Sequence, residues 1–295
     1  MQFIGHFLAF LSVFLWSSLY VCVKILLESF APLELLFLQF IIGYCFLLVL
    51  CPRFLKSTLK DESYLILAGL SGITIYNLFL NLAMDYSKAS NVSVIIATAP
   101  LFTALLAAFL KIEKLSFVFL GAFILCMSGI VLLSYEDGGF SFNPLGDSFA
   151  LLSALGWAAY SLLILKIMRK RGNLILITRR IIFYGILGML PSFLFLDFSP
   201  NLMLLLEPKI AFNLIFLALF ASGLCFLLWN HATLLIGAIK TNVYVYLTPL
   251  ITIIVSFFCF GRETLYFSPI WCIFNSSWGY LSRIQIFKTP ISLTI

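Results

Sequence analysis

The sequence predicts an all-α polytopic membrane protein, a bundle of ten helices built from two inverted-topology five-helix repeats. Of its 295 residues, 63% are hydrophobic and only 10% are charged, whereas a soluble domain carries about 25% charged residues. The apolar residues form solid runs of about 20, the length that crosses a bilayer, without the alternation of a transmembrane barrel. This composition excludes soluble enzymes, nucleic-acid binders and disordered chains, despite the net charge of +6.

Apolar runs bounded by charge, Pro or Gly define the spans. Nine clear runs cover residues 3–27, 33–51, 64–84, 90–110, 115–135, 148–168, 175–196, 210–230 and 236–260. A tenth run, 264–282, is interrupted by Pro269 and by three polar residues at 275–277. The turn-rich segment 136–147 reads as the linker between a first repeat at 5–135 and a second at 148–282.

Basic residues predict the orientation, because cytoplasmic loops are enriched in Lys and Arg. With the amino terminus in the cytoplasm, the outer side receives only Lys88, Lys209 and Arg262 in its loops, and most other basic residues fall inside. Lys24 and Glu34 flank the first outer loop, where they are expected to meet lipid headgroups. The chain is therefore expected in the cell (inner) membrane with a cytoplasmic amino terminus and a retained first helix.

Seven cysteines stand singly inside apolar runs, without the close pairs of a metal or redox site. They read as small core residues. No metal, cofactor or nucleic-acid partner is expected. The expected partners are the lipid bilayer and a small-molecule substrate, and a homodimer stays open.

Residues recur between the two halves at two closely similar offsets. Asn81 and Pro100 match Asn230 and Pro249 at an offset of 149 residues, and Trp16 matches Trp157 at 141. Because each copy has an odd number of helices, the second copy enters the membrane in the opposite direction. Inverted repeats place a substrate near the midplane, and rocking one half against the other exposes it to each side in turn.

The chain resembles the EamA-type carriers of the drug/metabolite transporter superfamily. The resemblance rests on Trp16 followed by Lys24, on the stretch 87–106 (SKASNVSVIIATAPLFTALL), on Glu113, and on a second copy of the block around Pro249. It implies ten helices, both termini in the cytoplasm, and transport of a small organic metabolite such as an amino acid.

The carboxy terminus departs from that family after about Gly261. The fourth helix of a repeat is expected to end in Gly-Glu, whereas this chain has Gly261-Arg262-Glu263, with one extra residue. Dropping one A from GGA AGA GAA ACT yields Gly-Glu-Lys-Leu, which echoes the residues at 112–115. The hypothesis is a frameshift near 261–263 that replaced the native tail. Sequencing the locus tests it, and an uninterrupted frame with a stable tenth helix would refute it.

Polar side chains at membrane depth are costly and mark candidate site residues. Asn77 and Asn81 lie one turn apart beside Tyr76, and Asn230 with His231 occupies the matching place in the second copy, next to Trp229. Amides both donate and accept hydrogen bonds, which suits zwitterionic substrates. Hydrogen bonds that merely join helices remain an open alternative.

Aromatic pairs form a second set of candidates. Trp16 with Tyr20 and Trp157 with Tyr160 lie on the first helix of each half, and Tyr244 precedes Pro249. Such rings line ligand pockets and hold cations. They are also common packing and interface residues.

The remaining candidates have more specialised roles. Gln39 in the second span corresponds within about one residue to Arg180 in the seventh; Arg180 either binds a carboxylate or snorkels to the cytoplasmic surface. His231 is the deep imidazole for proton coupling, with a structural role as the alternative. Pro100 and Pro249 are expected to kink their helices and act as hinges.

The leading functional hypothesis is a secondary carrier of a small metabolite that works by alternating access. One alternative is an inactive, frameshifted remnant of such a carrier. Another is a membrane-embedded enzyme acting on lipid-linked substrates, but the spans lack the clustered acids or histidines of such a site. The chain is therefore not expected to be an enzyme, and without a phosphate-binding loop it is not expected to use ATP directly.

Overall fold

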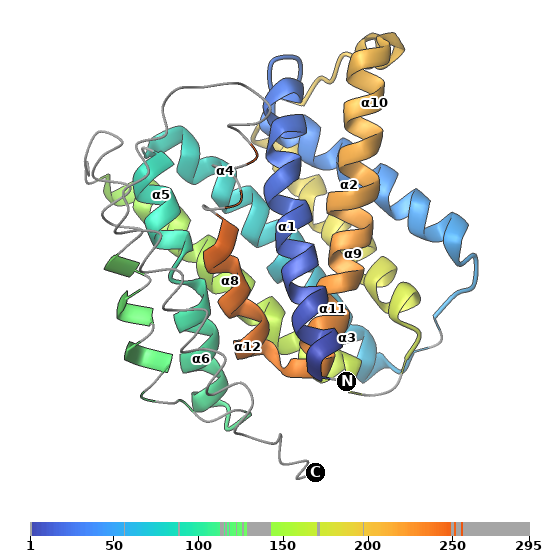
Figure 1. Cartoon of the computed structure of the whole chain (residues 1–295). Helices are drawn as coiled ribbons and strands as arrows, with labels where there is room; N and C mark the ends of the chain where they lie inside the picture. Colours follow the sequence, from blue (N-terminus) through green and yellow to red (C-terminus); the bar gives the residue numbers. More distant parts are fainter. Residues whose placement is uncertain are drawn as a thin grey trace.

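A computed structural model of the chain describes residues 2–112 except 56 and 88, residues 143–248 except 170, 171 and 197, and isolated positions at 115–128, 251 and 255. Within these residues the protein is entirely helical (Figure 1). Six helices are long and apolar enough to cross a bilayer. They span Gln2–Leu19, Pro32–Leu50, Leu59–Tyr86, Pro144–Met168, Leu174–Leu194 and Pro208–Ile236. The chain is a polytopic membrane protein.

The first half contains α1 (Gln2–Leu26), α2 (Pro32–Leu50), α3 (Leu59–Gly69), a π-helical segment η1 (Leu70–Ile75), α4 (Tyr76–Tyr86), α5 (Ala89–Ile96) and α6 (Ala99–Phe109). The second half begins with α8 (Pro144–Met168), α9 (Leu174–Met189) and the 3₁₀ segments η2 (Leu190–Leu194) and η3 (Leu202–Leu206). It continues with α10 (Pro208–Leu217), the π-helical segment η4 (Ala218–Leu224), α11 (Cys225–Ile236), α12 (Ala238–Val243) and the 3₁₀ turn η5 (Tyr244–Leu247).

Helix starts follow from local sequence. The side chain of Asn143 accepts from the Gly146 amide and caps α8, and Asn173 caps α9 through the Ile175 and Leu176 amides. Such caps satisfy amides that the first helical turn leaves unpaired. Proline follows directly at Pro32 and Pro144, in the first turn, where a missing amide hydrogen costs nothing.

Two predicted spans differ in detail from the structure. The span predicted at 90–110 is divided into α5 and α6 by a turn at 97–98, and Pro100 lies in the first turn of α6. Pro100 therefore begins a helix instead of kinking a continuous one. The span predicted from 236 starts as the short α12 and tightens to the 3₁₀ turn η5 just before position 249.

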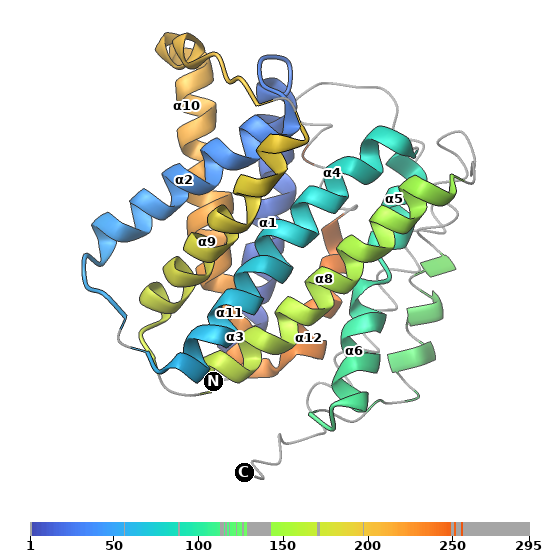
Figure 2. The ribbon, with the colours of Figure 1, turned by 180° about the vertical axis from the view of Figure 1, so that it is seen from behind.

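The first helix of each half packs against the third helix of the other half. α1 lies along α11, and α8 lies along α4 (Figures 1 and 2). The second helices behave alike, since α2 packs on η4 and α9 packs on α3 and η1. The two halves therefore share one interior.

The π-helical segments occupy matching places in the two third helices, and each packs on a glycine. A Cβ on Gly43 of α2 would lie 2.8 Å from the Cβ of Ser222 in η4, and one on Gly185 of α9 would lie 2.4 Å from the Cβ of Ile73 in η1. Only a residue without a side chain permits these approaches. A hydrogen bond joins η1 to α9 at the same place, where Thr74 donates to the carbonyl of Gly185 at 2.8 Å.

Several predictions fall outside the described residues. These are most of the span at 115–135, most of the linker, Pro249, and the tail with its proposed frameshift and tenth helix. The side chains of Tyr20 and Lys24 also lie outside them.

Candidate functional site

Three indole rings meet where α1, α8 and α11 come together. The ring centroids of Trp16 and Trp157 are 6.0 Å apart, those of Trp157 and Trp229 are 5.5 Å apart, and those of Trp16 and Trp229 are 5.6 Å apart. These separations are typical of favourable aromatic pairs. We call these three residues the indole cluster.

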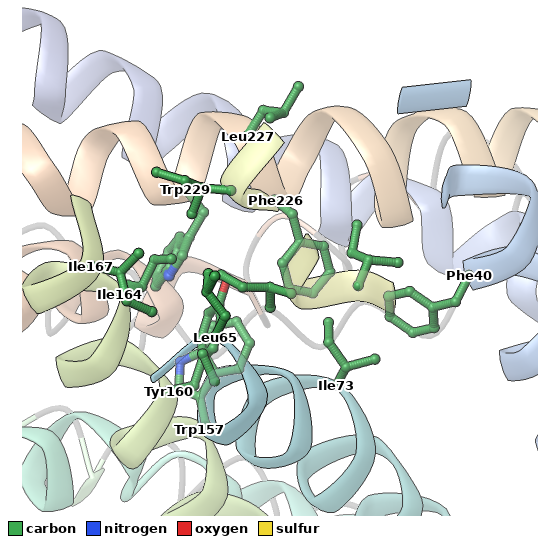
Figure 3. Packing of buried hydrophobic residues seen from close by; sticks show 14 of the residues in the cluster. Phe40, Leu65, Ile73, Trp157, Tyr160, Ile164, Ile167, Phe226, Leu227 and Trp229 are labelled. Atoms are coloured by element: carbon green, nitrogen blue, oxygen red, sulfur yellow. The ribbon is translucent and has the colours of Figure 1, made fainter. Parts of the chain in front are cut away.

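Further rings surround the indole cluster. Tyr76 lies 4.8 Å from Trp157 between ring centroids, and Phe226 lies 5.4 Å from Trp16. Figure 3 shows Trp157 and Tyr160 of α8 grouped with Phe226 and Trp229 of α11 in the buried core. Four helices from both halves thus contribute rings to one site.

The three indole nitrogens have different environments. Trp157 Nε1 donates to Asn242 Oδ1 at 2.8 Å, and Trp16 Nε1 donates to the carbonyl of Ala221 in η4 at 3.1 Å. Trp229 is fully buried, and its Nε1 donates to none of the described residues. A buried donor without an acceptor is uncommon and costly, so Trp229 differs in this respect from the other two indoles of the cluster.

A buried hydrogen-bond chain runs beside the cluster. The hydroxyl of Tyr160 donates to Asn230 Oδ1 at 2.7 Å, and Asn230 Nδ2 donates to Thr178 Oγ1 at 3.0 Å. All three side chains are fully buried. The chain joins α8, α11 and α9 and fixes which way the amide of Asn230 points.

The structure thus brings together six of the residues predicted from sequence, namely Trp16, Tyr76, Trp157, Tyr160, Trp229 and Asn230. Their role in binding stays a prediction.

The other candidates have separate surroundings. Asn77 Nδ2 donates to the carbonyl of Ile73 in η1 at 2.8 Å, while Asn81, Gln39 and His231 are half-buried on α4, α2 and α11.

Tyr244 packs against the buried core that contains Trp157 and Trp229. Its hydroxyl is 3.0 Å from Nδ1 of His6 near the start of α1.

Arg180 forms an ion pair and does not enter the cluster. Its Nε lies 2.6 Å from Glu62 Oε1 on α3, and the hydroxyl of Tyr184 donates to the same oxygen. Ser57 donates to the other oxygen of Glu62. The arginine therefore joins α9 to α3, a partner that the snorkelling interpretation did not include.

Sequence reasoning missed Asn242, Thr178 and Phe226. Asn242 and Thr178 are polar residues at membrane depth, and the criterion that selected Asn230 would have found them. Phe226 carries no signal of its own among 32 phenylalanines.

The site presents apolar ring faces beside hydrogen-bonding groups. None of the hydrogen bonds and ring contacts that the described residues make with Trp16, Trp157, Trp229, Tyr160 or Asn230 involves a charged side chain. In the described part of the chain, no group of three or more His, Cys, Asp or Glu residues could hold a metal ion.

Known proteins are similar to this chain in sequence and in fold. Residues 3–135 and 144–279 each match the EamA-like transporter family. An "Uncharacterized transporter" of Archaeoglobus fulgidus is 28% identical over 290 residues, which cover 95% of this chain and 97% of that one. "Uncharacterized transporter YdfC" of Bacillus subtilis is 25% identical over 255 residues, which cover 85% and 82%.

A solved structure titled "Crystal structure of protein" shares the fold. Its TM-score is 0.78 at 19% identity, and the match covers 95% of this chain and 98% of that one. The two family matches together span most of the sequence. The chain belongs to the EamA-like transporter family.

Proposed function

We propose that the protein is a secondary carrier that moves a small organic metabolite, such as an amino acid or a related compound, by alternating access. The observation that carries the proposal is the indole cluster with its buried hydrogen-bond chain, located where helices of both halves meet. Relative movement of the helices that surround this cluster would open it to either side of the membrane.

The proposed architecture is ten helices in two inverted repeats, at 5–135 and 148–282, with a cytoplasmic amino terminus in the inner membrane. The exchange of packing partners supports it, because α1 lies on α11 as α8 lies on α4. The matching π segments η1 and η4 support it as well.

Transport by the purified protein in proteoliposomes tests the function. Pooled metabolites are offered with and without ion gradients, and solutes are measured inside and outside the vesicles. Flux of at least one solute that requires the protein is expected. Turnover of a lipid-linked substrate without any solute flux would refute the carrier function and favour a membrane enzyme.

Substitutions at two amides connect flux to the proposed site. Asn230→Ala breaks the chain from Tyr160 to Thr178, and Asn81→Ala changes the matching position of the first half. Each is expected to change the KM of the transported solute while membrane abundance stays the same. An unchanged KM in both variants would remove these amides from the site.

The inactive remnant remains the alternative because of the interrupted tail after about Gly261. Replacing that tail with the sequence of the other reading frame gives the matched comparison. A solute carried only by the restored chain would show that the present chain is such a remnant.

A further inference from the structure

Two oppositely charged side chains are buried on the pair of helices α2 and α9, which lie side by side (Figure 2). Glu34, near the start of α2, is 8% exposed, and Arg179, in α9, is 4% exposed. We call the end where α2 ends and α9 begins the inner end, and the opposite end of the pair the outer end.

At the inner end, Arg179 holds the chain that follows α2. Its guanidinium donates to the carbonyls of Cys51 and Arg53 and lies 5.7 Å from the ring centroid of Phe54. The carbonyls at the end of a helix carry partial negative charge and lack helical partners, so a cation there is favourable.

At the outer end, Glu34 holds the chain that follows α9 and η2. Its Oε1 accepts from the amide of Ser199 at 3.0 Å, and its Oε2 accepts from the amide of Ala31 at 3.0 Å. Phe37 adds apolar contact, with centroid distances of 4.8 Å to Phe193 and 5.3 Å to Phe198. Its position beside the first outer loop suggested that Glu34 meets lipid headgroups. The carboxylate is instead buried and binds backbone amides of the protein.

The two contacts are reciprocal. Arg179 lies in the first half of α9 and binds the backbone directly after α2, whereas Glu34 lies in the first turn of α2 and binds the backbone of the segment that follows η2. Neither forms an ion pair with a described residue. A buried charge held only by backbone groups is expensive to leave unpaired, but water can replace such groups when the helices separate.

We propose that Arg179 and Glu34 are paired end latches of the α2–α9 contact, that is, side chains whose hydrogen bonds hold its two ends together. Arg179 holds the inner end closed, and Glu34 holds the outer end closed. In the structure both latches are closed. This inference rests on the proposed carrier function, which requires the two ends to open in turn. Its test measures distances without any substrate, so failure of the latches leaves the carrier function standing, and a lack of transport leaves the distances informative.

The test is a pair of spin-label distances in lipid nanodiscs, on a chain whose native cysteines are replaced. Labels at Pro52→Cys and Gly172→Cys report the inner end, and labels at Ala31→Cys and Leu194→Cys report the outer end; all four positions are exposed. Each pair is measured in the parent protein, in Arg179→Met and in Glu34→Ala.

We expect each variant to open only its own end. Arg179→Met should raise the ratio of long to short distances about tenfold at the inner pair and leave the outer pair unchanged. Glu34→Ala should do the reverse. The conservative variants Arg179→Lys and Glu34→Gln retain part of the hydrogen bonding and should give smaller shifts in the same direction, which keeps the test valid should a stronger variant fold poorly.

Matched controls come from neighbouring charges. Arg180→Met removes the adjacent arginine of α9, whose partner Glu62 lies on α3 and not on α2. Glu28→Gln removes an exposed carboxylate near the outer end. Neither should change its distance pair. Folded latch variants with parental distances at their own end would overturn the proposal, as would variants that loosen both ends equally.

Discussion

The hydroxyl of Tyr160 offers a one-atom test of the site. Changing Tyr160 to Phe keeps the ring among its neighbours and removes only the donor to Asn230 Oδ1, at 2.7 Å. Both residues are fully buried, so water does not replace the lost donor without a rearrangement. Asn230 keeps its bond to Thr178, and its carbonyl oxygen loses the partner it has in the structure.

The magnitude follows from these contacts. Hydrogen bonds between side chains inside a membrane contribute about 0.6 kcal/mol on average and about 1.7 kcal/mol at most. Leaving a buried acceptor unpaired adds a cost of order 1 kcal/mol. The free energy of unfolding of Tyr160→Phe is therefore expected to fall by about 1–2 kcal/mol.

Equilibrium unfolding in mixed detergent micelles titrated with SDS measures this change. Tyr44→Phe is the matched control, because Tyr44 is half-buried on α2 and its hydroxyl bonds to none of the described residues. It should change the unfolding free energy by less than about 0.5 kcal/mol. A double-mutant cycle of Tyr160→Phe with Asn230→Leu should give a coupling free energy of about 1 kcal/mol between the two positions. Equal effects of Tyr160→Phe and Tyr44→Phe, with no coupling, would refute the buried hydrogen bond.

Two further substitutions test the packing around the cluster. Gly72→Ala places a Cβ 2.4 Å from the ring of Tyr160, so we expect the free energy of unfolding to fall by about 1–3 kcal/mol in the same assay. Gly121→Ala is the control, because a Cβ there has nothing within 4 Å, and it should leave the free energy of unfolding unchanged. Asn242→Ala removes the acceptor of the Trp157 indole; we expect a loss of about 0.6–1.7 kcal/mol and a shift in tryptophan emission, and an unchanged spectrum would argue against that bond.

The sequence predicted an all-helical polytopic membrane protein because apolar spans leave strong signals. Apolar length defines a helix in a bilayer, and the repeat, at its second offset of 141 residues, made Trp16 and Trp157 joint candidates before their contact was known. Asn230 was found because an amide at membrane depth is rare. Trp16 and Trp157 belong to the indole cluster, and Asn230 belongs to the hydrogen-bond chain beside it.

Other features could not be predicted because they depend on partners far away in sequence. The segment 70–75 reads as ordinary apolar helix, and its π form accompanies the close approach of α9 at Gly185. Glu34 and Arg180 read as surface charges, because their positions along a helix say nothing of the chain ends and side chains opposite them. A sequence places a side chain along a helix; the packing decides what it faces.

The exchanged packing indicates which parts of the bundle move together. α1 and α2 pack on the helix formed by α10, η4 and α11, while α8 and α9 pack on the helix formed by α3, η1 and α4. Each of these two groups combines helices from both halves of the sequence.

Separating the halves would break both groups, because the third helix of each half is packed on the first two helices of the other. Among the described residues, sliding one group past the other chiefly breaks the contacts of α2 with α9 and α4 and those of α11 with α8 and α9. The indole cluster and both buried charges of the α2–α9 pair lie along these boundaries, whereas the pair of Arg180 with Glu62 lies inside the second group. The alternating access that we propose is therefore expected between the two mixed groups and not between the two sequence repeats.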